Sequence, residues 1–440
     1  MHAFIDLVFD KLTGYHYGDF VKAKDKSLAF VAIVSTRVLF DLNTSLAATR
    51  HLEMDLVASH MRIAFSAPRH GEYIRSGTPS EPILAEVAAM GMHECKIDAV
   101  DVIDVELKLG LIDGNTRTEL VARLLLIMAY DRALKKSHPG GGPPVGGYSR
   151  AVSVRDFLQA LVAEAYVGDV LGCKPDGARD PQVSLEEAFD GAFVRFSHFA
   201  RNGVDNAVDT YAGLAAVARG MAIQCCRGQG SVDIVIPIVL KDEKLREGVM
   251  STMLIQVNDR GSRVSSLDVT AESLGVFPRV PKGGEEDRRP YIVINMQLGA
   301  MASPKNAWFV GSSGTREVSA VQRAPAPPPP GHTTAQSTHR THPRYFINID
   351  GCSHKVYGVI TEADNPRFAR ILAAHDLFAE HARPELKDQV QEMKPEWNRN
   401  RACYGWMNQP ELWSASDEGG GIGEEVVVCG SGDAVDHDDL

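Results

Sequence analysis

The chain has 440 residues, enough for two or three domains with sizeable cores. Its 44% hydrophobic and 23% charged residues are typical of a globular protein, and no apolar run approaches the roughly 18 residues that a membrane-spanning helix needs. The net charge of −11 does not exclude nucleic acid at the core, but no basic field argues for it. Seven cysteines without C-x-x-C spacing indicate reduced thiols, so we expect an intracellular protein of the cytoplasm or nucleus, with no membrane partner.

The first half of the chain carries helical patterns. Residues 1–138 are expected to form a helical N-terminal region, in which Ser80 is a candidate N-cap. Thr116 and Glu119 have the spacing of a capping box that opens a strongly apolar helix. Residues 148–220 are expected to add further helices that pack on the core.

The core is expected within residues 221–316, where three apolar runs follow one another closely. Met221–Cys226, Val232–Leu240 and Thr252–Val257 are rich in Val, Ile and Leu, which predicts strands that are buried on both faces. The connections are too short for a crossover helix, so neighbouring strands should pair antiparallel. Asp233 lies near the start of the second run, where a carboxylate costs several kcal/mol unless it is paired or binds a metal.

This layout resembles the core of the restriction-endonuclease-like, or PD-(D/E)XK, nuclease superfamily. Asp233 matches the Asp of the motif and Gln256 matches its Glu or Gln, which together would hold Mg²⁺ as the cofactor. Asn258 stands where the motif has a Lys that orients or activates water, and a neutral amide cannot take that role. Lys241 is a candidate for supplying charge from nearby. The superfamily often adds a Glu from a preceding helix, for which Glu119 is a candidate beside its interpretation as a cap.

The rest of the chain changes in composition. Residues 317–343 form a Pro-rich linker whose histidines, including His342, are expected in solvent and not in a zinc site. Residues 344–413 predict a small α+β appendage with a hairpin at the Asp350-Gly351 turn. Residues 414–440 form an acidic, Gly-rich tail that is expected to be disordered.

These patterns predict an α/β fold with a mixed sheet of restriction-endonuclease-like type, in a chain that also resembles uncharacterised fungal proteins. The broken motif favours a non-catalytic module that docks on a protein or on nucleic acid. The alternatives are a Mg²⁺-dependent nuclease, with Asp233, Gln256 and Asn258 at its catalytic site, and an intracellular scaffold with a helical interaction surface. A purely structural interpretation of Asp233 is that its carboxylate accepts hydrogen bonds from backbone N–H groups.

Overall fold

A computed structural model gives the fold of the first compact unit of the chain, Met1–His375. The second unit, Asp376–Leu440, lies outside the described residues. The structure describes residues 2–23, 26–43, 47–66, 74–113, 116–137, 147–176, 182–201, 208–226, 232–241, 244–258, 269–272, 274–277, 287–299, 308–310 and 342–373.

Helices and strands in the described residues are as follows. The helices are α1 (His2–Thr13), α2 (Tyr17–Phe20), α3 (Ser27–Val38), α4 (Ala47–Ser59), α5 (Pro82–Glu94), α6 (Ala99–Lys108), α7 (Arg117–Lys136), α8 (Val154–Leu161), α9 (Glu164–Leu171), α10 (Leu185–Ala188), α11 (Thr210–Arg219) and α12 (Asn365–Ala373). The strands are β1 (Ile63–Ser66), β2 (Arg75–Gly77), β3 (Val152–Ser153), β4 (Phe193–Val194), β5 (His198–Arg201), β6 (Met221–Gln224), β7 (Ile234–Val239), β8 (Met250–Asn258), β9 (Tyr291–Gln297), β10 (Trp308–Val310) and β11 (Arg344–Asp350).

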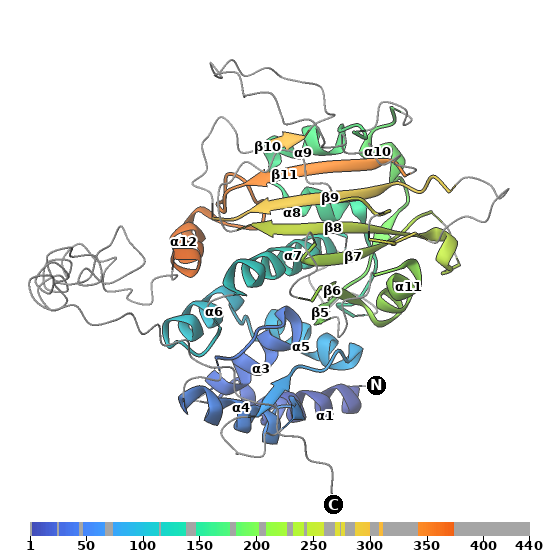
Figure 1. Cartoon of the computed structure of the whole chain (residues 1–440). Helices are drawn as coiled ribbons and strands as arrows, with labels where there is room; N and C mark the ends of the chain where they lie inside the picture. The colour runs from blue at the N-terminus through green and yellow to red at the C-terminus, as the bar shows by residue number, and fades with distance from the viewer. Residues whose placement is uncertain are drawn as a thin grey trace, which may run out of the picture. The chain divides into compact units, whose positions relative to one another are not determined.

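A mixed sheet forms the centre of this unit. Its strands follow the order β10-β11-β9-β8-β7-β4-β3, with β6 paired to β7 and β5 to β6 (Figure 1). The three predicted strands are confirmed as β6, β7 and β8, and both of their pairings are antiparallel, as expected from the short connections. The next two strands, β9 and β11, run parallel to β8.

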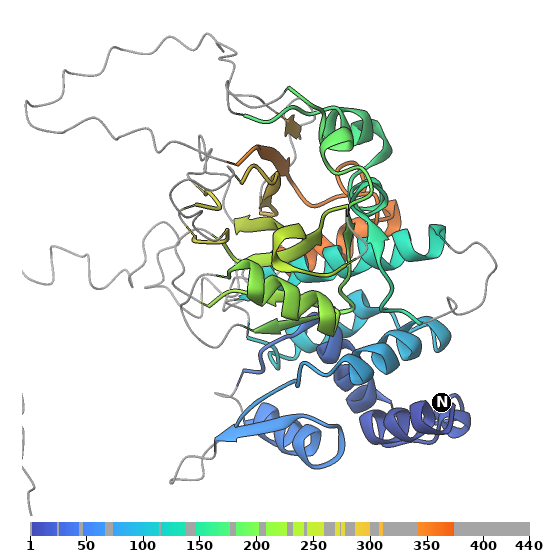
Figure 2. The ribbon, with the colours of Figure 1, turned by 90° about the vertical axis from the view of Figure 1, so that its right-hand side faces the viewer.

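Helices cover both faces of the sheet. Helices α7 and α8 pack on one face, where their apolar side chains join Ile234, Ile236 and Ile255 in the main core. Helix α11 packs on the other face against β6, β7 and β8 (Figures 1 and 2). All six residues of β7 are buried, which explains its almost uninterrupted Val and Ile sequence.

The N-terminal region is helical, as predicted, and it lies beside β5, which α3 contacts (Figure 1). Two of its predicted caps are wrong. Ser80 is not an N-cap, because α5 begins at Pro82 after Glu81, and the Ser80 hydroxyl lies 2.9 Å from Nε2 of His198. Thr116 precedes α7 but makes no side-chain capping bond there, since its hydroxyl donates to the Asp113 carbonyl at 3.2 Å.

Residues 148–220 are less helical than expected. Their described residues contribute β3, β4 and β5 to the sheet, in addition to helices α8 to α11. Strand β4 pairs with β7, and β5 pairs parallel with β6. These strands are only two to four residues long, so their alternation was too short to be read as a strand pattern.

The predicted C-terminal appendage needs a correction where the structure describes it. The strand around Tyr345 does not form a hairpin at Asp350-Gly351; as β11 it pairs parallel with β9, inside the main sheet. His342 does not lie in solvent, because it is 6% exposed and stacks on Phe277 with the ring centroids 3.9 Å apart. The other residues of the predicted linker up to 341, and those of the predicted tail 414–440, lie outside the described residues.

No helix in the described part of the chain has both the length and the apolar character that crossing a lipid bilayer requires.

Candidate functional site

Asp233 lies at a local irregularity just before β7. Its backbone N–H donates to the Ile255 carbonyl at 2.9 Å, although the strand register pairs Ile255 with Ile234. Two residues of one strand therefore face one residue of the other, as at a β-bulge. Val232 and Val235 line the same cavity although they are three positions apart, which confirms that the alternation of side chains is interrupted at Asp233.

The Asp233 carboxylate is held by the backbone of the neighbouring strand. Its Oδ2 accepts a hydrogen bond from the Val257 N–H at 2.7 Å. Burial raises the pKa of Asp233 from 3.8 to about 6, and the negative charge of Glu119 adds to this shift, while the Val257 hydrogen bond and Arg123 oppose it. The Asp233 carboxylate thus accepts a hydrogen bond from a backbone N–H near the end of β8, which is the structural role that the sequence left open. Its negative charge is poorly compensated by its surroundings.

Glu119 approaches Asp233 from α7 and is not a helix cap. Its Oε2 accepts a hydrogen bond from the side-chain nitrogen of Gln224 at 3.1 Å and lies 3.8 Å from Nη1 of Arg123. The remaining oxygen of Gln224, Oε1, is buried and has no hydrogen-bond partner among the described residues. Glu119, Gln224 and Asp233 therefore form a polar cluster where β6 ends and β7 begins.

Arg123 ties this cluster to the N-terminal helices. It is fully buried, and its Nε and Nη2 each donate at 2.7 Å to a carbonyl at the end of α3, those of Val38 and Leu39. Burial lowers the pKa of Arg123 to about 10, and Glu119 opposes that shift. A cation at a helix C-terminus is favourable, so the guanidinium has a structural role there.

Gln256 and Asn258 lie at the end of β8, but they do not join Asp233. Both are partly buried, and neither side chain has a hydrogen bond to Asp233. The side-chain nitrogen of Asn258 donates instead to Oδ1 of Asn295 on β9, at 2.7 Å. Gln256 Oε1 is buried without a hydrogen-bond partner in the described residues. The charge that acts on Asp233 is therefore that of Glu119, and the Asn258 side chain bonds elsewhere.

Lys241 is excluded as a source of charge for this cluster. It follows β7, whereas Asp233 precedes that strand, so eight residues of extended chain separate them by roughly 25 Å. Lys241 is exposed, and its Nζ lies 3.3 Å from Oδ2 of Asp190.

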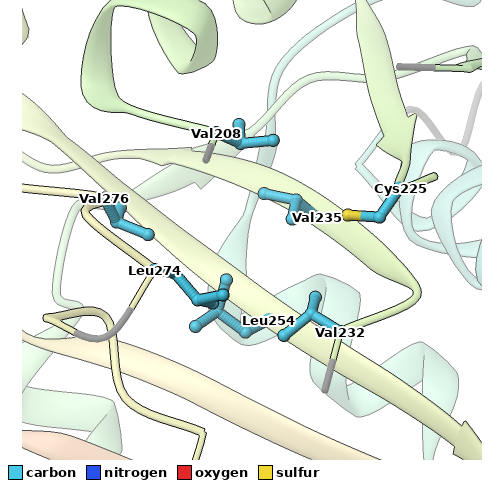
Figure 3. A pocket seen from close by; sticks show the side chains of 7 residues that line it. All are labelled: Val208, Cys225, Val232, Val235, Leu254, Leu274 and Val276. Atoms are coloured by element: carbon cyan, nitrogen blue, oxygen red, sulfur yellow. The ribbon is translucent and has the colours of Figure 1, made fainter. Parts of the chain in front are cut away.

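An apolar cavity of about 10 Å³ lies on the sheet face that α11 covers. Valine and leucine side chains and Cys225 line it (Figure 3). It has room for at most one water molecule. Burial raises the pKa of the Cys225 thiol to about 12, so this cysteine is a packing residue.

The described residues contain no group of three or more His, Cys, Asp or Glu side chains arranged to hold a metal ion. Glu119, Gln224 and Asp233 are two carboxylates and one amide, which are oxygen ligands of the kind that Mg²⁺ prefers. Any Mg²⁺ at this place would depend on these three side chains, and substrate phosphates would have to complete its coordination.

The sequence carries a signal for some of the site residues that the nuclease motif does not include. Gln224 is a polar residue in the apolar run Met221–Cys226, and Arg123 is a charge in an otherwise apolar helical stretch. Buried polar residues of this kind need partners. Which residues they pair with could not be predicted from the sequence, because partners such as Glu119 and Gln224 are 105 positions apart.

The comparisons with known proteins place the chain in a family without assigning it an activity. Neither the curated proteins nor the solved structures contain a match to it. The family model described as "Domain of unknown function (DUF8736)" matches residues 19–272, a segment that includes α3 to α11, β6, β7, β8 and the Asp233 cluster. Since that match covers more than half of the 440 residues, the chain belongs to the DUF8736 family.

Proposed function

We propose that this protein is a non-catalytic interaction module with a core of restriction-endonuclease-like type. The carrying observation is the position of Asn258, whose side chain bonds to Asn295 at 2.7 Å and leaves Asp233 to the Val257 N–H. The order β6-β7-β8-β9 is compatible with the resemblance, because Asp233 precedes one strand and Gln256 lies near the end of its antiparallel neighbour.

The chemistry of a nuclease would need more charge than this site offers. A general base or a cation near the reacting phosphate stabilises the charge that develops in the transition state. Asn258 is neutral, and its amide is already engaged by Asn295. Lys241 lies at the far end of β7. These facts support binding without catalysis.

The cations that the structure describes near the cluster do not favour a nucleic acid as the partner. Arg201 ends β5 beside the cluster, but its guanidinium is paired with Asp41 at 2.7 Å. Arg123 is fully buried. Phosphate backbones are bound by several accessible Lys or Arg side chains, so these contacts favour a protein or a small polar molecule over nucleic acid.

A cleavage assay tests the absence of catalysis. The full chain, Asn258→Lys and Asp233→Ala would be incubated with single-stranded DNA, double-stranded DNA and RNA in the presence of Mg²⁺ or Mn²⁺. We expect no cleavage by any of them, because a lysine at 258 would point towards Asn295 and not towards Asp233. Metal-dependent cleavage by the wild type that Asp233→Ala abolishes would establish an enzyme instead.

One observation favours the second candidate, a Mg²⁺-dependent nuclease. Glu119 is not a cap, and it lies close enough to Asp233 for its charge to raise the pKa of that carboxyl. Carboxylates with raised pKa values gather at functional sites, although structural networks produce them too. In that case Glu119 and Asp233 would hold the ion, with Gln224 as a third oxygen ligand.

Metal binding separates the two candidates without relying on activity. Mn²⁺ titration followed by electron paramagnetic resonance would compare the wild type with Glu119→Gln and with Glu186→Gln, a control on the exposed surface of α10. The non-catalytic proposal expects no difference among the three proteins. Tighter binding by the wild type than by Glu119→Gln, with Glu186→Gln unchanged, would favour the nuclease.

A further inference from the structure

Helix α6 presents a line of exposed side chains along one face, beside α12 (Figure 1). Asp101, Val105 and Lys108 are four and three positions apart, so they follow one another along that face. Leu109 comes directly after the helix, one turn beyond Val105. Val105 and Leu109 are 49% and 61% exposed although they are apolar. The opposite side of α6 is buried, with Ile103 fully inside the main core.

The end of this face where α6 begins carries an excess of acid. Asp98, Asp101 and Asp364 each lie 2.7 to 2.9 Å from Arg367 of α12, so three carboxylates share one guanidinium. The side chains of Asp98 and Asp101 remain 43% and 63% exposed despite these contacts. This end of the face is therefore negative, and its charge is accessible from solvent.

The end where α6 stops has the opposite balance. Asp104 pairs with both Lys108 and Arg370, each at 2.8 Å, so two cations share one carboxylate. The side chains of Lys108 and Arg370 are 56% and 49% exposed, whereas Asp104 is buried. The last acid of the helix, Glu106, lies on its buried side. The exposed face of α6 is thus negative at its start, apolar around Val105, and positive at its end.

We infer that this face of α6 binds the same face of a second copy of the chain, with the two helices antiparallel. A two-fold axis through Val105 places the two valines against each other. The same axis brings Asp101 of each copy beside the partner's Lys108 and covers the exposed Leu109. Antiparallel pairing therefore sets the negative start of each helix against the positive end of the other. A surface that is complementary to itself in this way is what an isologous dimer contact requires.

The size of the contact sets its strength. Helix α6 has ten residues and is therefore roughly 15 Å long. Stable interfaces bury about 1,200–2,000 Å² in total, which one pair of helices of this length does not reach. We therefore expect a weak dimer, with a dissociation constant of about 0.1–1 mM. Because α6 belongs to the N-terminal helical region, this inference does not depend on the nuclease-like core or on the absence of catalysis.

The test is the oligomeric state of the full chain, measured by sedimentation velocity at concentrations from about 10 µM to about 1 mM. We expect the average mass to rise with concentration towards that of a dimer. The rise should be smaller in about 0.5 M NaCl than in about 0.05 M NaCl, because salt screens the exposed charges at the two ends of the helix.

Two variants at Val105 test the geometry. Val105→Glu and Val105→Lys should each stay monomeric over this range, because like charges would meet at the two-fold axis. An equimolar mixture of the two variants should dimerise at least as well as the wild type, because opposite charges would then meet there. Leu245→Glu is the matched control, since Leu245 is 48% exposed and lies outside α6, and it should dimerise as the wild type does.

The inference fails if the wild type stays monomeric up to about 1 mM, if Val105→Glu dimerises as the wild type does, or if the mixture of the two variants stays monomeric. The wild-type measurement needs no variant, so it remains decisive even if a substitution disturbs folding, which circular dichroism would detect. A failure here leaves the cleavage result untouched. Cleavage by the wild type would overturn the proposed function whatever the sedimentation experiments show.

Discussion

The Val257 N–H and the Asp233 carboxylate are 2.7 Å apart, across the antiparallel pair β7 and β8. The side chain of Asp233 thus accepts a hydrogen bond from the backbone of β8, at the place where the β-bulge interrupts the pairing of β7 with β8. A buried N–H without a partner would cost about 1–3 kcal/mol, so this bond gives Asp233 a structural role whether or not the site binds a ligand.

Replacing Asp233 by Asn should stabilise the protein at alkaline pH. The folded-state pKa is raised from 3.8 to about 6, so the native state binds the proton more tightly than the unfolded chain does. Stability is therefore lost as the pH rises from about 4 to 6. Asp233→Asn removes this ionisation and keeps an acceptor for Val257, so we expect a gain of at most about 3 kcal/mol at pH 8 and little difference at pH 4. Urea unfolding at both pH values measures it.

The matched control for that prediction is Asp190→Asn, which removes an exposed carboxylate near Lys241. It should change stability by less than about 1 kcal/mol at either pH. A decrease in the stability of Asp233→Asn at pH 8 would contradict the prediction.

The pKa of Asp233 should fall in Glu119→Gln. The charge of Glu119 raises the pKa of Asp233, and a glutamine keeps the shape of the side chain without its charge. Titration of the Asp233 carboxyl carbon by NMR would measure the change. The pKa should stay above the ordinary value, because burial is the larger cause of the shift. An unchanged Asp233 pKa would show that the two carboxyls are too far apart to interact.

Removal of the Asp131 carboxylate should destabilise the junction between the N-terminal helices and the sheet. Asp131 accepts two hydrogen bonds from Arg37, at 2.7 and 2.8 Å, and Arg37 is fully buried. Asp131→Ala leaves that guanidinium uncompensated, and we expect a loss of about 3–5 kcal/mol in the free energy of unfolding. Arg155→Ala breaks an exposed ion pair with Glu186 and should cost less than about 1 kcal/mol. Equal losses in the two variants would refute this account.

Helix α12 should be held mainly by apolar burial and less by its ion pairs. Phe368 is fully buried, so Phe368→Ala should cost about 3–5 kcal/mol. Arg367 lies 2.7 Å from both Asp98 and Asp101 on or beside α6, but these acids are 43% and 63% exposed. Arg367→Ala should therefore cost about 1 kcal/mol or less, and the effect should shrink as salt is added. Hydrogen exchange of α12 amides at low and high salt would distinguish the two contributions.

Local sequence patterns determined the centre of the fold. The Val- and Ile-rich runs of β6, β7 and β8, with their short connections, predicted an antiparallel set of buried strands, and this is confirmed. The apolar stretch of α7 likewise predicted a central helix, and most of that helix is buried. These predictions succeed because hydrophobic period and connection length act over a few residues.

The tertiary structure decided which polar residues meet. Glu119 accepts a hydrogen bond from Gln224, more than a hundred positions along the chain, and its charge raises the pKa of Asp233. Asn258 bonds to Asn295 in place of a catalytic partner. Strand β11 entered the sheet beside β9, where the sequence had predicted a separate hairpin. A parallel strand pairing and a β-bulge depend on how segments that are distant in the sequence pack against one another. The alternation of side chains along one strand does not specify which strand will pair with it.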